Sequence, residues 1–206
     1  MSHAAIAIEE LSPVEQQQFQ LWTADIQAIA NKSTSASLAR KPPRLTIVPL
    51  TQGATTHHAS TTGDKFMISP DLLPACADLR HYFIAHELGH AEGRHPLITA
   101  ASPVIGAAPF GYLSIATQHL GGIGPVGFGI GSVMLAASAI TMLAYARTMV
   151  FEWDADRRGA RMIGEQNMLA GIALAKGLRA PASSAFYDNK RDRLMGKRPS
   201  LWKPKD

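Results

Sequence analysis

A chain of 206 residues, of which 46% are hydrophobic, is long enough for one domain with a substantial core. Its single cysteine, Cys76, excludes a disulfide framework and also excludes a zinc site built from paired thiolates. The net charge of +4 comes from the C-terminal part, because residues 1–96 hold seven Lys and Arg against nine Asp and Glu, whereas residues 147–206 hold thirteen against seven.

The first 43 residues predict an amphipathic helix followed by a linker. Ser12 and Pro13 supply a cap and a proline at the first helical position, and Glu15 completes a capping box. Apolar residues then recur at steps of three and four and form one face: Phe19, Trp22, Ile26 and Ile29. Because the polar face is not basic, we expect this helix to pack on the rest of the domain and not on a membrane. Residues 31–43 are interpreted as the linker.

Two short strands are predicted next, at Arg44–Leu50 and Lys65–Ser69. The segment between them is polar and rich in turn formers, so it predicts a loop in which His57 and His58 are exposed. The second strand directly precedes the helix described below. We expect a peptide to add beside this strand through main-chain hydrogen bonds.

The segment His86-Glu87-Leu88-Gly89-His90 is the one that indicates a chemistry. Apolar residues with helical spacing precede it, and Asp78 is expected to cap the helix. On a helix, His86 and His90 lie one turn apart on the same face, so both imidazoles can reach one metal ion. Glu87 follows the first histidine, where its carboxylate can take a proton from a water that the metal activates. The alternative is a helix with two surface histidines paired to carboxylates.

A long stretch, residues 97–146, contains no Asp, Glu, Lys or Arg. It divides into two apolar segments, Leu97–Thr117 and Val126–Ala146, each close to the roughly 20 residues that cross a bilayer as a helix. Basic residues flank only the open end, so both ends are predicted in the cytoplasm. We therefore predict an integral membrane protein (of the inner or cell membrane if bacterial) whose active site faces the cytoplasm. The alternative is a buried hairpin in a soluble, cytosolic oligomer.

A catalytic zinc needs a third protein ligand, and two candidates compete for this role. His95 comes one residue too early for the longer pattern HExxHxxGxxH, in which Pro96 occupies the required position. Glu152 and Asp156 lie one turn apart in a helix predicted from about Arg147 to Lys176. We favour Glu152 as the third ligand, with Asp156 orienting a ligand histidine through its other ring nitrogen. A solvated acidic patch near a helix start is the alternative.

Together, HELGH at residues 86–90, the apolar interval, and Glu152-x-x-x-Asp156 within FEWDAD resemble the HtpX-like and CAAX-prenyl-protease-type membrane zinc metallopeptidases, which are gluzincins. The resemblance covers roughly residues 44–165. It implies one Zn²⁺ ion per chain, held by the two histidines and Glu152, with Glu87 as the general base of peptide-bond hydrolysis.

The predicted fold class is α+β, mainly α, with a zincin-like metallopeptidase domain and an inserted apolar helical hairpin. We divide the chain into an N-terminal helix and linker at 1–43, a catalytic domain at 44–179 interrupted by the hairpin 97–146, and a basic C-terminal tail at 180–206. The tail is predicted to be mostly extended, and we interpret its basic charge as affinity for an anionic membrane surface and not for nucleic acid.

The predicted function is that of a zinc-dependent endopeptidase of membrane or misfolded proteins. Its expected partners are a polypeptide substrate and the lipid bilayer, without nucleic acid, and a homo-oligomer is compatible with the sequence. The alternative is a non-catalytic zinc-binding protein of a membrane or an oligomer. Glu87 distinguishes the two, because a structural zinc site does not need a carboxylate beside an open coordination position.

Overall fold

The computed structural model describes residues 5–49, 59–95, 150–178 and 184–196. The chain divides into two compact units, residues 1–93 with 153–206 and residues 94–152, and nearly all of the described residues belong to the first. Both predicted apolar spans lie outside the described residues. Among the helices that the structure describes, none combines the length and the apolar character needed to cross a bilayer.

The N-terminal helix α1, Pro13–Ala30, forms as predicted. Its capping box is complete, because the backbone N–H of Glu15 donates to Ser12 Oγ and the backbone N–H of Ser12 donates to Glu15 Oε2 over 2.8 Å. The Ser12 hydroxyl also donates to Glu15 Oε2 over 2.6 Å, and this bond, followed by that from the Ser12 backbone N–H, holds the pKa of Glu15 below its ordinary value. Trp22 and Ile26 are buried against the domain, which confirms that α1 packs on it.

The predicted linker contains a short helix, α2, at Ala36–Arg40. Single-turn 3₁₀ helices at Ile8–Glu10 and Pro70–Leu72 lie before α1 and before the motif helix. Neither these nor α2 shows a periodic apolar pattern in the sequence, and each is too short for such a pattern to appear.

The sheet has three strands, β1 at Arg44–Ile47, β2 at Ala59–Thr62 and β3 at Lys65–Ile68, in the order β1-β3-β2. β1 runs parallel to β3, and β2 runs antiparallel to it. β2 lies in the segment that we predicted as loop. Gly63, with φ of +61°, begins the two-residue turn into β3, and a Gly-Asp pair between strands is itself a hairpin signal.

The position of β3 contradicts the expectation that a peptide adds beside it. β3 is the central strand, and both of its edges are taken by β1 and β2. Within the described part of the chain, β2 has a strand partner on one side only. The edge that remains for an added strand near the motif helix is therefore that of β2.

Helix α3, Ala77–Glu92, carries the HELGH motif, and it ends at Gly93. Its N-cap is Cys76, so the predicted capping role of Asp78 is wrong. Asp78 lies inside the first turn, where its negative charge still favours the helix dipole. Most of the helix is buried, including Leu79, Tyr82 and Leu88.

Three further helices follow: α6 at Glu152–Ile163, α7 at Glu165–Gly177 and α8 at Ser184–Leu194. The predicted continuous helix is broken at Gly164, whose φ of +89° is left-handed and ends α6. The predicted extended tail is wrong for its described part, because that part forms α8 and packs on α7.

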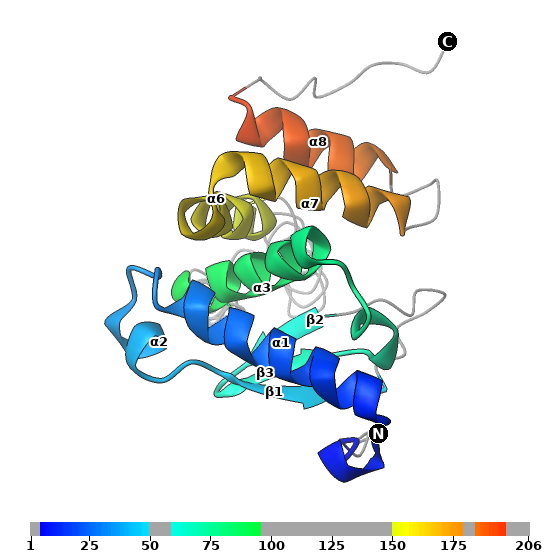
Figure 1. The fold of residues 1–206 in the computed structure, drawn as a ribbon. Helices are drawn as coiled ribbons and strands as arrows, with labels where there is room; N and C mark the ends of the chain where they lie inside the picture. The colour runs from blue at the N-terminus through cyan, green and yellow to red at the C-terminus, as the bar shows by residue number, and fades with distance from the viewer. Residues whose placement is uncertain (1–4, 50–58, 96–149, 179–183, 197–206) are drawn as a thin grey trace, which may run out of the picture. The chain divides into compact units, whose positions relative to one another are not determined.

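The fold is mixed α and β, mainly helical, with one small sheet, as predicted. Figure 1 shows α3 between the sheet and α1 on one side and α7 on the other. α8 covers α7 on the side away from α3. One apolar core joins these layers: Trp22, Ile26, Phe66, Ile68, Leu72, Ile84, Leu88, Met168 and Ile172.

Candidate metal centre

The two motif histidines converge on one point. His86 and His90 lie one turn apart on α3, and their Nε2 atoms are 3.2 Å apart. Two nitrogens that share a tetrahedral zinc at about 2.0–2.1 Å lie about 3.3–3.4 Å from each other. The observed separation therefore matches that of two ligands of one ion.

Asp156 of α6 holds the first histidine in the orientation that ligation needs. Its Oδ1 lies 2.6 Å from His86 Nδ1, and its side chain is only 2% exposed. A carboxylate accepts the Nδ1 proton, so the lone pair of the imidazole is on Nε2. The sequence-predicted pair of Asp156 and a ligand histidine is thus brought together, and the histidine is His86.

Glu152 is the third candidate donor. It is the first residue of α6, one turn before Asp156 on the same helix. One ligand atom from each of His86, His90 and Glu152 lies within 4.8 Å of the other two. Two imidazoles and one carboxylate form a donor set that catalytic zinc uses with a fourth position open, so these residues fit the metal.

Glu87, the residue after His86 on α3, contacts the sheet. Its Oε2 accepts a hydrogen bond of 3.1 Å from the backbone N–H of Thr61 on β2. An amide donor stabilises the charged form of a carboxylate and limits its rotation. The candidate base is therefore positioned by the strand that the sequence reading missed.

Small residues let α3 and α6 approach closely at the motif itself. A Cβ atom added to Gly89 would lie 2.3 Å from the carbonyl oxygen of Ala155. One turn further along α6, a Cβ on Gly159 would lie 3.0 Å from the backbone of Ala85. This crossing brings Asp156 to His86, so the glycine of HELGH has a structural role beside the ligands.

A model of peptidase family M48 matches residues 21–186, which is most of the chain. The chain belongs to peptidase family M48. The match extends beyond residues 44–165, because it begins within α1 and ends within α8. No curated protein and no solved structure matches the chain.

His95, the other candidate for the third ligand in this M48 chain, is not among the residues whose ligand atoms come together. Its ring stacks on that of Phe151, with centroids 4.5 Å apart and planes within 8°, and both residues belong to the unit 94–152. An aromatic stack accounts for the burial of an imidazole without a metal. His57 and His58 lie outside the described residues.

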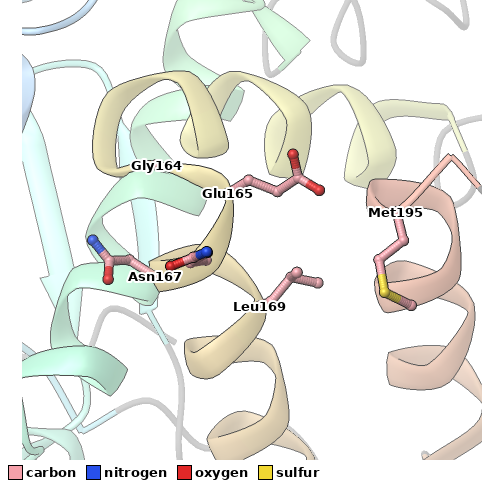
Figure 2. A pocket seen from close by; sticks show the side chains of 6 residues that line it. Gly164, Glu165, Asn167, Leu169 and Met195 are labelled. Carbon is pink, nitrogen blue, oxygen red and sulfur yellow. The ribbon is translucent and has the colours of Figure 1, made fainter.

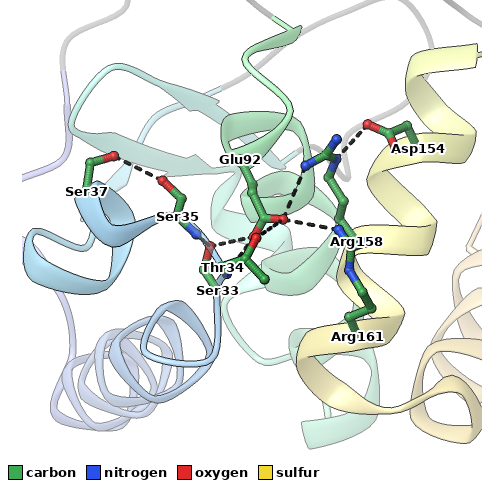
Figure 3. Close-up of polar contacts among 8 residues, drawn as sticks. All are labelled: Ser33, Thr34, Ser35, Ser37, Glu92, Asp154, Arg158 and Arg161. Carbon is green, nitrogen blue, oxygen red and sulfur yellow. Dashed lines mark hydrogen bonds and ion pairs between the residues drawn. The ribbon is translucent and has the colours of Figure 1, made fainter.

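A buried carboxylate near the C-terminus of α3 in this M48 domain binds residues that follow α1 and residues of α6. Glu92, with a side chain only 4% exposed, accepts hydrogen bonds from Ser33 Oγ at 2.5 Å and Thr34 Oγ1 at 2.9 Å. Arg158 and Arg161 of α6 each reach its Oε1 over 3.2 Å (Figure 3). Burial acts to raise the pKa of Glu92, but the hydrogen bonds and Arg158 outweigh it and hold that pKa below its ordinary value.

Sequence reasoning also missed Lys190 of α8. Its side chain is 7% exposed, and its Nζ lies 3.3 Å from Asp156 Oδ2. One signal was available, because Tyr187, Lys190 and Leu194 recur at steps of three and four and mark one helix face. The basic composition of the segment obscured that pattern.

An open hollow lies at the turn between α6 and α7 and the end of α8. Figure 2 shows Glu165, Asn167, Leu169 and Met195 around it. None of the candidate metal ligands lines this hollow. The hollow is thus separate from the candidate metal centre.

Proposed function

We propose that this chain is a zinc-dependent endopeptidase that hydrolyses peptide bonds with Glu87 as general base. The observation that carries the proposal is the convergence of His86 and His90, whose Nε2 atoms lie 3.2 Å apart with Glu152 in the same ligand group. Membership of peptidase family M48 supports a metallopeptidase in general.

Each residue of the site has a separate role in the proposed hydrolysis. Zinc held by His86, His90 and Glu152 would polarise the scissile carbonyl and make the attacking water more acidic. Glu87 accepts a proton from that water as its oxygen bonds to the carbonyl carbon, and it passes the proton to the leaving amine as the C–N bond breaks. Asp156 keeps the proton of His86 on Nδ1, so that Nε2 stays available as a ligand.

The substrate we propose is an extended polypeptide that adds beside β2. The backbone N–H of Thr61 points to Glu87 and not to β3, so the outer side of β2 faces the candidate base. Main-chain hydrogen bonds along such an edge bind a peptide largely without regard to its sequence. This property suits a peptidase of misfolded or membrane proteins.

Replacement of Glu87 by Gln tests the proposed chemistry. Because Glu87 is not among the metal donors, Glu87→Gln is expected to keep the fold and one zinc per chain. It should lose cleavage of unfolded casein by about 100- to 10,000-fold, since it removes the general base. Zinc content and initial cleavage rates are measured on the same preparations.

The matched control is Glu165→Gln, at an exposed position on α7, which should cleave at the wild-type rate. Wild-type cleavage by Glu87→Gln would remove Glu87 from the mechanism. A wild type that binds zinc but cleaves nothing would favour the alternative of a non-catalytic zinc protein.

We also propose that residues 97–146 anchor the protein in a membrane as a helical hairpin, with the active site in the cytoplasm. The support is in the sequence, which has no charge over these residues and basic residues at the open end only. The wild type should then stay in the membrane pellet in high-pH carbonate. Leu135→Arg should release it or lower its accumulation, because an Arg at the centre of a span costs about 2.5–3.5 kcal/mol on the insertion scale.

Leu120→Arg provides the control for the anchor, because it makes the same substitution in the predicted turn between the two spans. This variant should remain in the pellet. If carbonate extracts the wild type itself, the hairpin packs against protein and the cytosolic alternative replaces the anchored one.

A further inference from the structure

A buried lysine of α8, Lys190, contacts the Asp156 carboxylate that binds His86. Lys190 Nζ lies 3.4 Å from Asp156 Oδ1 and 3.3 Å from Asp156 Oδ2, so the ammonium contacts both carboxylate oxygens. Oδ1 is the oxygen that lies 2.6 Å from His86 Nδ1. Lys190 thus contacts Asp156, and Asp156 contacts His86, one of the candidate metal ligands.

All three side chains are buried, so the charge of Lys190 matters for the stability of the Asp156 carboxylate. The side chains of Lys190, Asp156 and His86 are 7%, 2% and 9% exposed. Removing a carboxylate from water costs several kcal/mol unless an opposite charge and hydrogen bonds compensate. Lys190 supplies that opposite charge, and the face of Phe186, 5.0 Å from Nζ, adds a favourable contact for the ammonium.

The position of the lysine also restricts the geometry of the carboxylate. A cation that contacts both oxygens opposes rotation of the carboxylate about its Cβ–Cγ bond. That rotation would move Oδ1 away from His86 Nδ1 and release the imidazole from its orientation.

The attachment of α8 to the domain does not depend on Lys190 alone. Lys176 of α7 forms a separate ion pair with Asp188 of α8, at 2.8 Å, where both side chains are 38% exposed. Tyr187 is buried in the core and also holds α8 in place. The docking of the helix and the contact with Asp156 can therefore be tested separately.

We propose that Lys190 is a positioning residue that acts through Asp156 to hold His86 ready for the metal. This role rests on the proposed zinc peptidase function. It assigns part of the site to a helix that contributes no metal ligand.

The test measures zinc affinity, by competition with a chromophoric chelator, and kcat and KM for an unfolded substrate. Lys190→Met keeps the apolar stem and removes the charge. It is expected to weaken zinc binding by roughly 3- to 10-fold, less than the about 10- to 100-fold loss for a direct partner of a ligand. At saturating zinc, kcat should fall while KM stays near the wild-type value. Lys190→Arg should recover most of the loss.

The control is Lys176→Met, which removes the other lysine contact to α8 and should leave zinc affinity unchanged. If Lys190 acted only through its charge, Lys190→Met would bind zinc more tightly, because the loss of a nearby cation lessens the repulsion of Zn²⁺. Tighter zinc binding in Lys190→Met, or an equal loss in Lys176→Met, would therefore overturn the proposal.

A double-mutant cycle shows whether Lys190 acts through Asp156. In an Asp156→Asn background, Lys190→Met should change zinc affinity little, because the carboxylate that it positions is gone. Additive losses would contradict the proposed route. Wild type that binds zinc without cleaving would refute the peptidase function and leave the affinity comparison valid, whereas wild type that binds no zinc would refute both.

Discussion

Gly89→Ala is expected to lower the free energy of unfolding by about 3 kcal/mol, toward the upper end of overpacking effects, and to abolish zinc binding at micromolar zinc. The added methyl group would lie 2.3 Å from the carbonyl oxygen of Ala155, and a backbone atom cannot turn away as a side-chain tip can. α6 must move, and it carries Asp156 and Glu152 with it. A change that touches no ligand should thus remove the metal.

Denaturant unfolding and zinc content measure this result, and Gly177→Ala serves as the control. Gly177 ends α7, and an added Cβ there meets nothing within 4 Å. Because alanine favours a helix over glycine, this control should be neutral or more stable by up to about 1 kcal/mol. Normal zinc content in Gly89→Ala would show that α3 and α6 do not need this close approach.

Glu152→Ala is expected to lower zinc affinity by more than about 100-fold, beyond the range for residues that only orient a ligand. It removes one of the three converging donors. Asp156→Ala should lose about 10- to 100-fold, because His86 would keep its place in the helix but lose its acceptor. His95→Ala should leave the affinity near that of the wild type, because its ring stacks on Phe151.

Isothermal titration of metal-stripped protein with zinc compares these variants. Glu165→Ala, which removes an exposed glutamate at the start of the next helix, corrects for the general loss of a negative charge. If His95→Ala loses the metal while Glu152→Ala keeps it, the third ligand is wrongly assigned.

The motif helix and the first helix could be predicted because each carries a local, periodic signal. The capping box at Ser12 and the one-turn spacing of His86 and His90 depend only on helix geometry. β2 could not be recognised by alternation, because Ala59–Thr62 has no large apolar residue and gains its place from pairing with β3. Its turn at Gly63 was the better signal.

The parts of the site that the sequence did not reveal depend on contacts between distant segments. Lys190 and Asp156 are 34 residues apart, and Thr61 and Glu87 are 26 apart. No local spacing relates such residues, since their contact exists only after α8 and β2 have packed. The break at Gly164 was missed because one glycine inside an apolar helical pattern is often tolerated.

The contacts of Glu92 have a consequence for how the domain opens. His90 lies two residues before Glu92, and the same carboxylate binds Ser33 and Thr34 at the exit of α1. A fluctuation that detaches α1 removes the Ser33 and Thr34 contacts and leaves Glu92 held by Arg158 and Arg161 of α6 alone, so we expect the last turn of α3 to be held less firmly than the turn of His86, which Asp156 binds separately. Amide exchange around His90 is therefore expected to depend on the docking of α1, a helix that begins at Pro13 and supplies no candidate ligand.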